Sequence, residues 1–227
     1  MVYRESGGWK RCRPHGPGGG GRLGSRLMHL LTASHVAEEL GLSDRGRMLV
    51  GAIAPDGHNG HRDRTHFKGP RYDWSDSAPY QYGRFLVKYR QYRTDSFFIG
   101  YLTHLVADDE WQSALCFSGI LEQLRARGAG RETLHHDFYL SNAKLLAKRD
   151  GGALRRRLAS GSWSDAMDEV EPAGIKQVKQ DALNDFDYPV ANLKAPLAVL
   201  PLELLEASIE RAAVRAIDAA YPWIHMD

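Results

Sequence analysis

The sequence predicts an all-α fold, a single-domain helical bundle, and three observations carry that prediction. Apolar residues recur at helical spacing over most of the chain after residue 24, whereas no stretch of useful length alternates as a β-strand does. Gly and Pro interrupt these stretches where helices would end. A chain of 227 residues that is 43% hydrophobic can fill one substantial core, which favours one domain over two.

The helical segments follow one another from residue 26 onwards. The first, over 26–40, is expected to end at Gly41, and Ser43 can cap a second that runs to about Ala54. A loop over 55–76 is rich in Gly, Pro and Asp, and a loop of that length in a compact domain usually signals function or disorder. Pro201 lies in the first turn of the last expected helix. The remaining helices are expected at 78–92, 95–127, 131–149, 163–169, 173–184 and 201–220.

Residues 1–23 differ from the rest of the chain. They carry five basic residues and a glycine run, and they lack the apolar segment of a secretory signal. We interpret them as a disordered leader or a misassigned start, and we take 24–227 as the domain. The basic residues of the leader are Arg4, Lys10, Arg11, Arg13 and Arg22.

Bulk composition argues against several classes of partner. A net charge of +2 gives no strong signal for nucleic acid. No stretch approaches the roughly 18 apolar residues that a membrane span needs. Cys12 lies in the leader and Cys116 in an apolar helical run, so no disulfide is expected between them. A cytoplasmic location follows as the default expectation.

His104 and Asp108 are the most informative pair in the chain. They lie one helical turn apart in an otherwise apolar run, so the imidazole and the carboxylate share one face of the helix. A neutral imidazole and an ionised carboxylate are good ligands for Zn²⁺. A capping or hydrogen-bonding pair is the commoner reading of this spacing when it stands alone.

The loop that begins at Pro55 adds further candidate ligands. Asp56 follows Pro55 directly and His66 lies further along the loop, with His58 and His61 between them. We interpret His58 and His61 as solvated, and Asp56 and His66 as ligands that complete a set of two histidines and two carboxylates. Such a nitrogen and oxygen set without thiolate suits a catalytic zinc site more than a structural one.

Two more segments contribute residues of the same kind. His29 lies near the start of the first helix, and His135 and Asp137 are expected to lean inward from the helix at 131–149. Each of these histidines, taken singly, is more often a surface or core-edge residue. Because several separated segments each offer a His or an Asp beside an apolar helix, convergence on one site is the favoured reading.

Four segments together resemble the bacterial zinc-dependent phospholipase C-like family. They are GSRLMHLL at 24–31, LVGAIAPD at 49–56, THF at 65–67 and GYLTHLVADDEW at 100–111, and 135–146 resembles the family's next helix. The resemblance covers residues 24 to about 150 and, more loosely, the chain to about 215. It implies the all-helical fold of phospholipases C and single-strand nucleases, with a cluster of zinc ions that cleaves phosphodiesters.

The resemblance also implies roles for individual residues. Asp56, His66, His104 and Asp108 are similar to the ligands of one zinc in that family, and His29 and His135 to further ligands. Two features of the family are missing, because the only early tryptophan is Trp9 within the leader and no His-x-x-x-Glu pair begins at His135 or His136. One zinc site is therefore expected, a second could form through His135 and Asp137, and a cluster of three is not expected.

The predicted function is a metal-dependent hydrolase, a zinc phosphodiesterase or phosphoesterase. Zn²⁺ lowers the pKa of a bound water to about 7 and so supplies a hydroxide nucleophile, which Asp56 could orient as the catalytic residue. The substrate would be a small phosphoester or a lipid headgroup, and Tyr72, Trp74, Tyr80 and Tyr82 could line its pocket. Arg64 and Lys68 are candidates for a phosphate contact.

Two alternatives remain open at this point. An HD-type metal phosphohydrolase would use His104, His136, Asp137 and either Asp165 or Asp168, but it leaves Asp56 and His66 unexplained. A non-catalytic helical module would use Asp56, His66, His104 and Asp108 to close the tetrahedral shell of one structural zinc.

Overall fold

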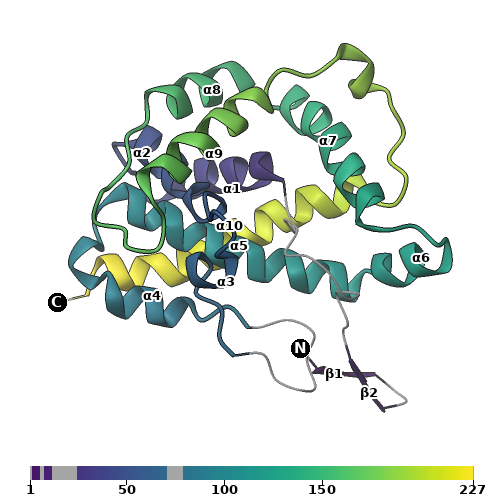
Figure 1. Cartoon of the computed structure of the whole chain (residues 1–227), viewed down its shortest axis with the longest axis horizontal. Coiled ribbons are helices and arrows are strands. Elements are labelled where there is room, and N and C mark those ends of the chain that lie inside the picture. Colours follow the sequence, from purple (N-terminus) through teal and green to yellow (C-terminus); the bar gives the residue numbers. More distant parts are fainter. Residues whose placement is uncertain (1, 6–7, 12–24, 71–78, 227) are drawn as a thin grey trace.

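The computed structural model describes residues 2–5, 8–11, 25–70 and 79–226, and these confirm the all-α prediction for the domain (Figure 1). A short antiparallel hairpin precedes it, formed by β1 (Val2–Glu5) and β2 (Gly8–Arg11). These two strands lie within residues 1–23, which the sequence predicts to be a disordered leader or a misassigned start. The α-helices in the described ranges are α1 (Arg26–Glu39), α2 (Arg45–Gly51), α3 (Arg62–Thr65), α4 (Tyr82–Lys88), α5 (Ser96–Phe117), α6 (Ile120–Ala126), α7 (Arg131–Ala147), α8 (Gly151–Ser160), α9 (Pro172–Asn184) and α10 (Leu202–Ile224). Short 3₁₀ turns lie at η1 (Ala54–Asp56), η2 (Arg90–Tyr92) and η3 (Val190–Leu193).

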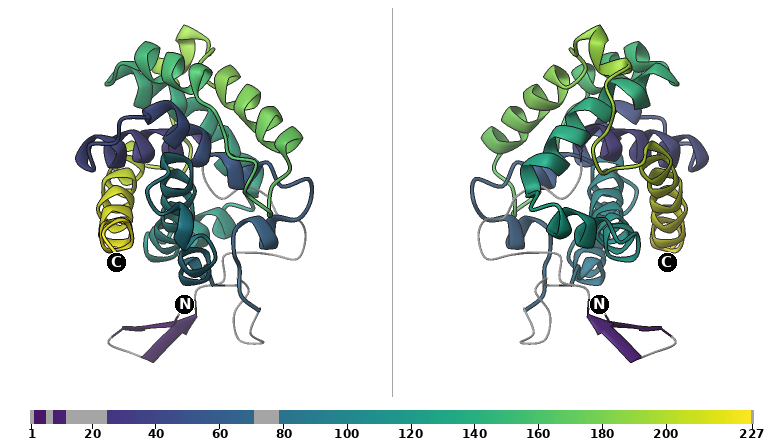
Figure 2. Two further views of the ribbon diagram at one scale, coloured as in Figure 1. Left: turned by 90° about the vertical axis from the view of Figure 1, so that its left-hand side faces the viewer. Right: turned by 90° about the vertical axis from the view of Figure 1, so that its right-hand side faces the viewer.

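Helix α5 is the centre of the bundle. Most of its residues are buried, and it packs against α10, α2 and α1. Helices α7, α8 and α9 lie together on one side of α5 and α10 (Figure 2). A helix that is apolar almost all round must be enclosed by other helices. Because α5 is enclosed in this way, its two polar residues His104 and Asp108 are buried as well.

Two glycines allow α2 and α5 to cross in backbone contact. A Cβ atom on Gly51 would lie 2.0 Å from the carbonyl oxygen of Phe97, and one on Gly100 would lie 2.1 Å from that of Met48. Since no larger residue fits this crossing, the backbone at the end of α2 reaches the side of α5 where His104 lies. The carbonyl of Ala52 is thereby brought to 2.7 Å from the His104 ring.

Several predicted boundaries need correction. The side chain that caps α2 is Asp44 rather than Ser43. The expected helix at 95–127 is broken into α5 and α6 at Gly119, whose φ of 72° is a conformation that glycine adopts freely. A helix, α8, begins at Gly151, where a break was expected, and 163–169 is not helical. The loop at 55–76 contains η1 and α3 within its described part.

The cysteine prediction also changes. Cys116, on α5, is disulfide-bonded, so the expectation that the chain forms no disulfide is wrong. Cys12 lies outside the described residues. Because disulfides persist mainly in oxidising compartments, the disulfide at Cys116 removes the argument from cysteine usage for a cytoplasmic location.

No helix in the described ranges combines the length and apolarity that a membrane crossing requires.

Candidate metal centre

Five of the predicted ligands converge at one place in the bundle. They come from α1 (His29), from η1 (Asp56), from the residue that ends α3 (His66) and from α5 (His104 and Asp108). All five are buried, with side chains between 0% and 7% exposed. Their donor atoms form two overlapping groups of three, Asp56–His66–His104 and His29–His104–Asp108.

Backbone carbonyls determine which ring nitrogen of two histidines faces the centre. Nδ1 of His104 lies 2.7 Å from the Ala52 carbonyl oxygen, and Nδ1 of His66 lies 3.0 Å from that of Arg62. A carbonyl only accepts, so each Nδ1 carries the proton and each Nε2 presents a lone pair. These two Nε2 atoms lie 3.2 Å apart with no proton to share between them, an arrangement that a cation would stabilise.

The two carboxylates lie at matching distances from this pair. Nε2 of His66 is 3.7 Å from Oδ1 of Asp56 and 3.5 Å from Oδ2 of Asp108, and Nε2 of His104 is 3.8 Å from the same Asp108 oxygen. Zinc bonds of about 2.0–2.1 Å in a tetrahedron place neighbouring ligand atoms about 3.3 Å apart. The observed distances are within about 0.5 Å of that value, so these buried side chains could hold a metal ion through the two overlapping groups of three.

Two buried polar atoms at the centre lack hydrogen bonds. Asp108 Oδ1 and His29 Nδ1 have no hydrogen-bond partner among the described residues. The His29 ring stacks on that of His104 with centroids 3.9 Å apart, and its Nε2 is 3.4 Å from Asp108 Oδ1 without good hydrogen-bond direction. Unpaired buried polar atoms are rare and costly, so they are a second sign that the residues are arranged for a ligand.

The local sequence explains how the loop residues reach the centre. Pro55 starts η1, and Gly57, which follows it, packs so closely on Gly174 of α9 that a Cβ on Gly174 would lie 2.2 Å from the Gly57 carbonyl oxygen. This contact holds Asp56 in place. Tyr101 of α5 donates a hydrogen bond from its hydroxyl to the Thr65 carbonyl and so anchors the end of α3 beside His66.

Sequence reasoning missed Arg62, which enters the centre from α3. Its guanidinium donates to Oδ2 of Asp108 at 2.7 Å and to Oδ1 of Asp56 at 3.4 Å, and the residue is only 8% exposed. Tyr80 donates to the same Asp108 oxygen at 2.9 Å. An arginine in a loop reads as solvated in the sequence, and its position four residues before His66 was the available signal.

The protonation states favour metal binding. Burial lowers the pKa of His104 to about 3, and burial together with the charge of Arg62 lowers the pKa of His66. Burial opposes ionisation of Asp108, but Arg62 and His29 outweigh it and hold its pKa well below the usual range. The pKa of Asp56 is also lowered, because its interaction with His66 and the positive charge of Arg62 outweigh burial. Neutral imidazoles and ionised carboxylates are the forms that ligate zinc.

The predicted second ion at His135 and Asp137 is not assembled. His135 is exposed on α7 beside a cavity of about 210 Å³ that also contains Arg26 and Asp185. Asp137 is buried, but its carboxylate accepts hydrogen bonds of 2.7–2.9 Å from the backbone N–H groups of Ala198, Val199 and Leu200. Both oxygens of Asp137 are therefore occupied in holding the segment before α10, which corrects its assignment as a ligand.

The residues of the HD-type alternative are not brought together either. His104 is fully buried in the bundle, whereas His136, Asp165 and Asp168 are exposed.

Other residues near the centre have structural partners. The carboxylates of Asp109 and Glu110, which follow Asp108, bind Arg215 of α10. Tyr72 and Trp74 lie outside the described residues, and Arg64 donates to the Asp168 carbonyl. Lys68 lies over the Tyr80 ring, 4.7 Å from its centroid.

The two histidines between Asp56 and His66 differ in their surroundings. His61 is exposed, in agreement with a solvated position. His58 is half-buried, its ring centroid lies 6.1 Å from that of His66, and its Nδ1 is buried without a hydrogen bond among the described residues. The interpretation of His58 as a solvated residue is therefore corrected.

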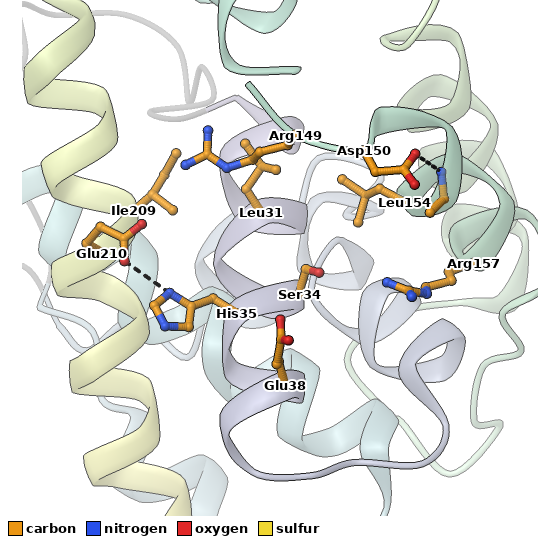
Figure 3. A pocket seen from close by; sticks show the side chains of 11 residues that line it. Leu31, Ser34, His35, Glu38, Arg149, Asp150, Leu154, Arg157, Ile209 and Glu210 are labelled. Carbon is orange, nitrogen blue, oxygen red and sulfur yellow. Dashed lines mark hydrogen bonds and ion pairs between the residues drawn. The ribbon is translucent and has the colours of Figure 1, made fainter. Parts of the chain in front are cut away.

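A cavity of about 350 Å³ lies apart from the centre, between α1, α8 and α10 (Figure 3). Charged side chains of both signs surround it, and Nδ1 of His35 lies 3.1 Å from a carboxylate oxygen of Glu210 at its edge. None of the predicted ligands lines this cavity. Its position therefore gives no support to a role in the same chemistry.

No protein-family model, no curated protein and no solved structure matches this chain.

Proposed function

We propose that this chain is a metal-dependent hydrolase, a zinc phosphodiesterase or phosphoesterase, with Asp56, His66, His104 and Asp108 as the metal ligands. The observation that carries the proposal is the pair of Nε2 atoms 3.2 Å apart, both with lone pairs directed at the centre by backbone carbonyls. A bound divalent ion would supply a Lewis acid and lower the pKa of a coordinated water.

The chain's own residues would divide the remaining work. Asp56 is the more accessible of the two carboxylates, 7% exposed against 1% for Asp108, so we assign it the orientation of the attacking water. The carbonyls of Ala52 and Arg62 hold the two imidazoles in the required tautomer. Tyr80 and Arg62 keep Asp108 ionised and oriented.

The proposed substrate class is a small phosphoester or a lipid headgroup. Its support is the resemblance of 24–150 to the bacterial zinc-dependent phospholipase C-like family, together with the agreement between the implied ligands and the residues that converge. The phospholipase C and nuclease type of fold belongs to the same proposal.

Metal content is the first test. The protein would be purified without added metal and measured by mass spectrometry beside the variants Asp56→Ala and His104→Ala, with His136→Ala as a control for an exposed histidine on α7. We expect near-stoichiometric zinc in the wild type and the control and its loss in the other two. A folded wild type that neither contains zinc nor takes it up would overturn the proposal.

Hydrolysis is the second test. Zinc-loaded wild type should release p-nitrophenol from bis(p-nitrophenyl) phosphate or from p-nitrophenyl phosphorylcholine, and Asp56→Ala should not. Loss of activity in His136→Ala would contradict the assignment, because that side chain lies outside the centre.

A non-catalytic module with one structural zinc is the second candidate. The nearly complete burial of His66, His104 and Asp108, each at most 1% exposed, favours it, because structural sites are closed to solvent. The two candidates differ when zinc is exchanged for cobalt. A visible spectrum that changes on addition of phosphate supports the hydrolase, and an unchanged spectrum with no turnover supports the structural site.

A further inference from the structure

The ligand set contains more donors than one metal ion needs. Asp56, His66 and His104 form one group and His29, His104 and Asp108 another, so the composition alone would accommodate two ions. Both groups depend on His104, however, whose Nδ1 is bound to the Ala52 carbonyl and whose Nε2 has a single lone pair. A second ion would therefore have to bind through His29 and Asp108 without His104.

Arg62 occupies a place between the two carboxylates that a second cation would otherwise take. Its guanidinium donates to Asp108 Oδ2 at 2.7 Å and to Asp56 Oδ1 at 3.4 Å. Arginine stays charged at any pH that proteins tolerate. The side chain is nearly buried, so its charge is compensated by these carboxylates and not by water.

The net charge of the centre favours one divalent ion over two. Asp56 and Asp108 carry two negative charges and Arg62 one positive charge, so one divalent ion leaves a net charge of +1 with neutral histidines. A second divalent ion would raise the net charge to +3 inside the protein. Buried charge that is not compensated is strongly unfavourable, which opposes a second ion.

The backbone and the side chain of Arg62 act separately. The carbonyl accepts the Nδ1–H bond of His66, and the Thr65 hydroxyl donates to the same oxygen at 3.1 Å. The guanidinium contacts the carboxylates. A side-chain substitution therefore leaves the carbonyl that orients His66 in the chain, which makes the charge of Arg62 testable by itself.

We infer that the Arg62 guanidinium is the built-in second cation of this centre and limits it to one divalent ion. The inference rests on the proposed function, because it concerns the metal that the same residues hold. In this role Arg62 is a positioning residue: it acts through Asp56 and Asp108 and sets the metal count.

The test is the number of zinc ions per folded chain. Metal-free protein would be titrated with Zn²⁺, separated from free metal by gel filtration and analysed by mass spectrometry, with the helical content checked by circular dichroism. We expect one ion in the wild type, one in Arg62→Lys, which keeps the charge, and two in Arg62→Met, which removes it. Tyr80→Phe is the matched control: it removes a donor to the same Asp108 oxygen without changing the charge, and it should keep one ion.

The outcomes separate this inference from the proposed function. Two ions in the wild type, or one ion in a folded Arg62→Met, overturn the role of Arg62 and leave the hydrolase proposal standing. No zinc in the wild type overturns the proposed function and the inference with it. Should Arg62→Met fail to fold, Arg62→Gln retains an amide donor without the charge and is expected to bind two ions. If neither neutral variant folds, the wild-type count decides between one ion, which supports the inference, and two.

Discussion

The crossing of α2 and α5 connects the packing of the bundle directly to the candidate metal centre, and Gly100→Ala tests that connection. A Cβ atom at position 100 would lie 2.1 Å from the carbonyl oxygen of Met48 and 2.9 Å from the backbone nitrogen of Ala52. Both atoms belong to the backbone of α2 and its end, so no side chain can move aside. The helices must separate.

The size of the effect follows from these distances. Bringing the Cβ to an ordinary contact of 3.4 Å requires α2 and α5 to move apart by about 1.3 Å. The His104 Nδ1 to Ala52 carbonyl distance, now 2.7 Å, would then exceed the range of a hydrogen bond. Overpacking of this kind costs about 1–3 kcal/mol of unfolding free energy, and loss of such an outer-shell partner costs about 10–100-fold in metal affinity.

Two measurements on the same variant check the expectation. Urea unfolding of the metal-free protein gives the loss of stability, and competition with a chromophoric chelator gives the zinc affinity. Gly83→Ala on α4 is the matched control, because a Cβ there meets nothing within 4 Å and should leave stability and affinity unchanged or raise stability slightly. If Gly100→Ala retained wild-type zinc affinity, the proposed link between the helix crossing and the His104 tautomer would be refuted.

Three further predictions address the rest of the centre. Zinc at about 100 times its dissociation constant should stabilise the protein by about 2.7 kcal/mol, which raises Tm by roughly 5–11 °C for a domain of this size; a melting curve that zinc does not shift would contradict metal binding. Asp137→Ala removes hydrogen bonds from three backbone N–H groups, each worth roughly 1.5–3 kcal/mol, so its unfolding free energy in urea should fall by several kcal/mol while its zinc content stays at the wild-type level. Loss of zinc would restore its assignment as a ligand. Because burial lowers the pKa of His104 to about 3, the unfolded chain binds more protons between pH 6.5 and 3, so the unfolding free energy of the metal-free protein should fall by a few kcal/mol as the pH decreases through that window. Urea midpoints that do not change between pH 7 and pH 4 would contradict a buried neutral His104.

Sequence reasoning succeeded where the signal was local. The helical period of 96–117, with Pro55 ending the preceding apolar stretch, predicted α5 and the irregular segment that carries Asp56. The spacing of His104 and Asp108 placed both on one face, and the structure shows them buried beside Asp56 and His66. Boundaries were predicted less well: Gly119 breaks an apolar run that by periodicity could have continued.

Asp137 shows why the remainder required the tertiary structure. Helical periodicity placed it on the inward face of α7, which is correct, but it could not say which groups Asp137 would meet there. Those groups are backbone N–H donors about sixty residues further along the chain. A buried carboxylate needs positive partners, and backbone amides satisfy that need as well as a metal ion does.

The sequence by itself therefore determined the all-α class, the central apolar helix and the residues of α5 and the following loop that can ligate a metal. The tertiary structure alone decided that His29 and not His135 joins them, that the Ala52 carbonyl orients His104, and that Arg62 lies between Asp56 and Asp108. The physical reason is that periodicity records which side of a helix avoids water, whereas the partner of each buried polar atom depends on how distant segments pack.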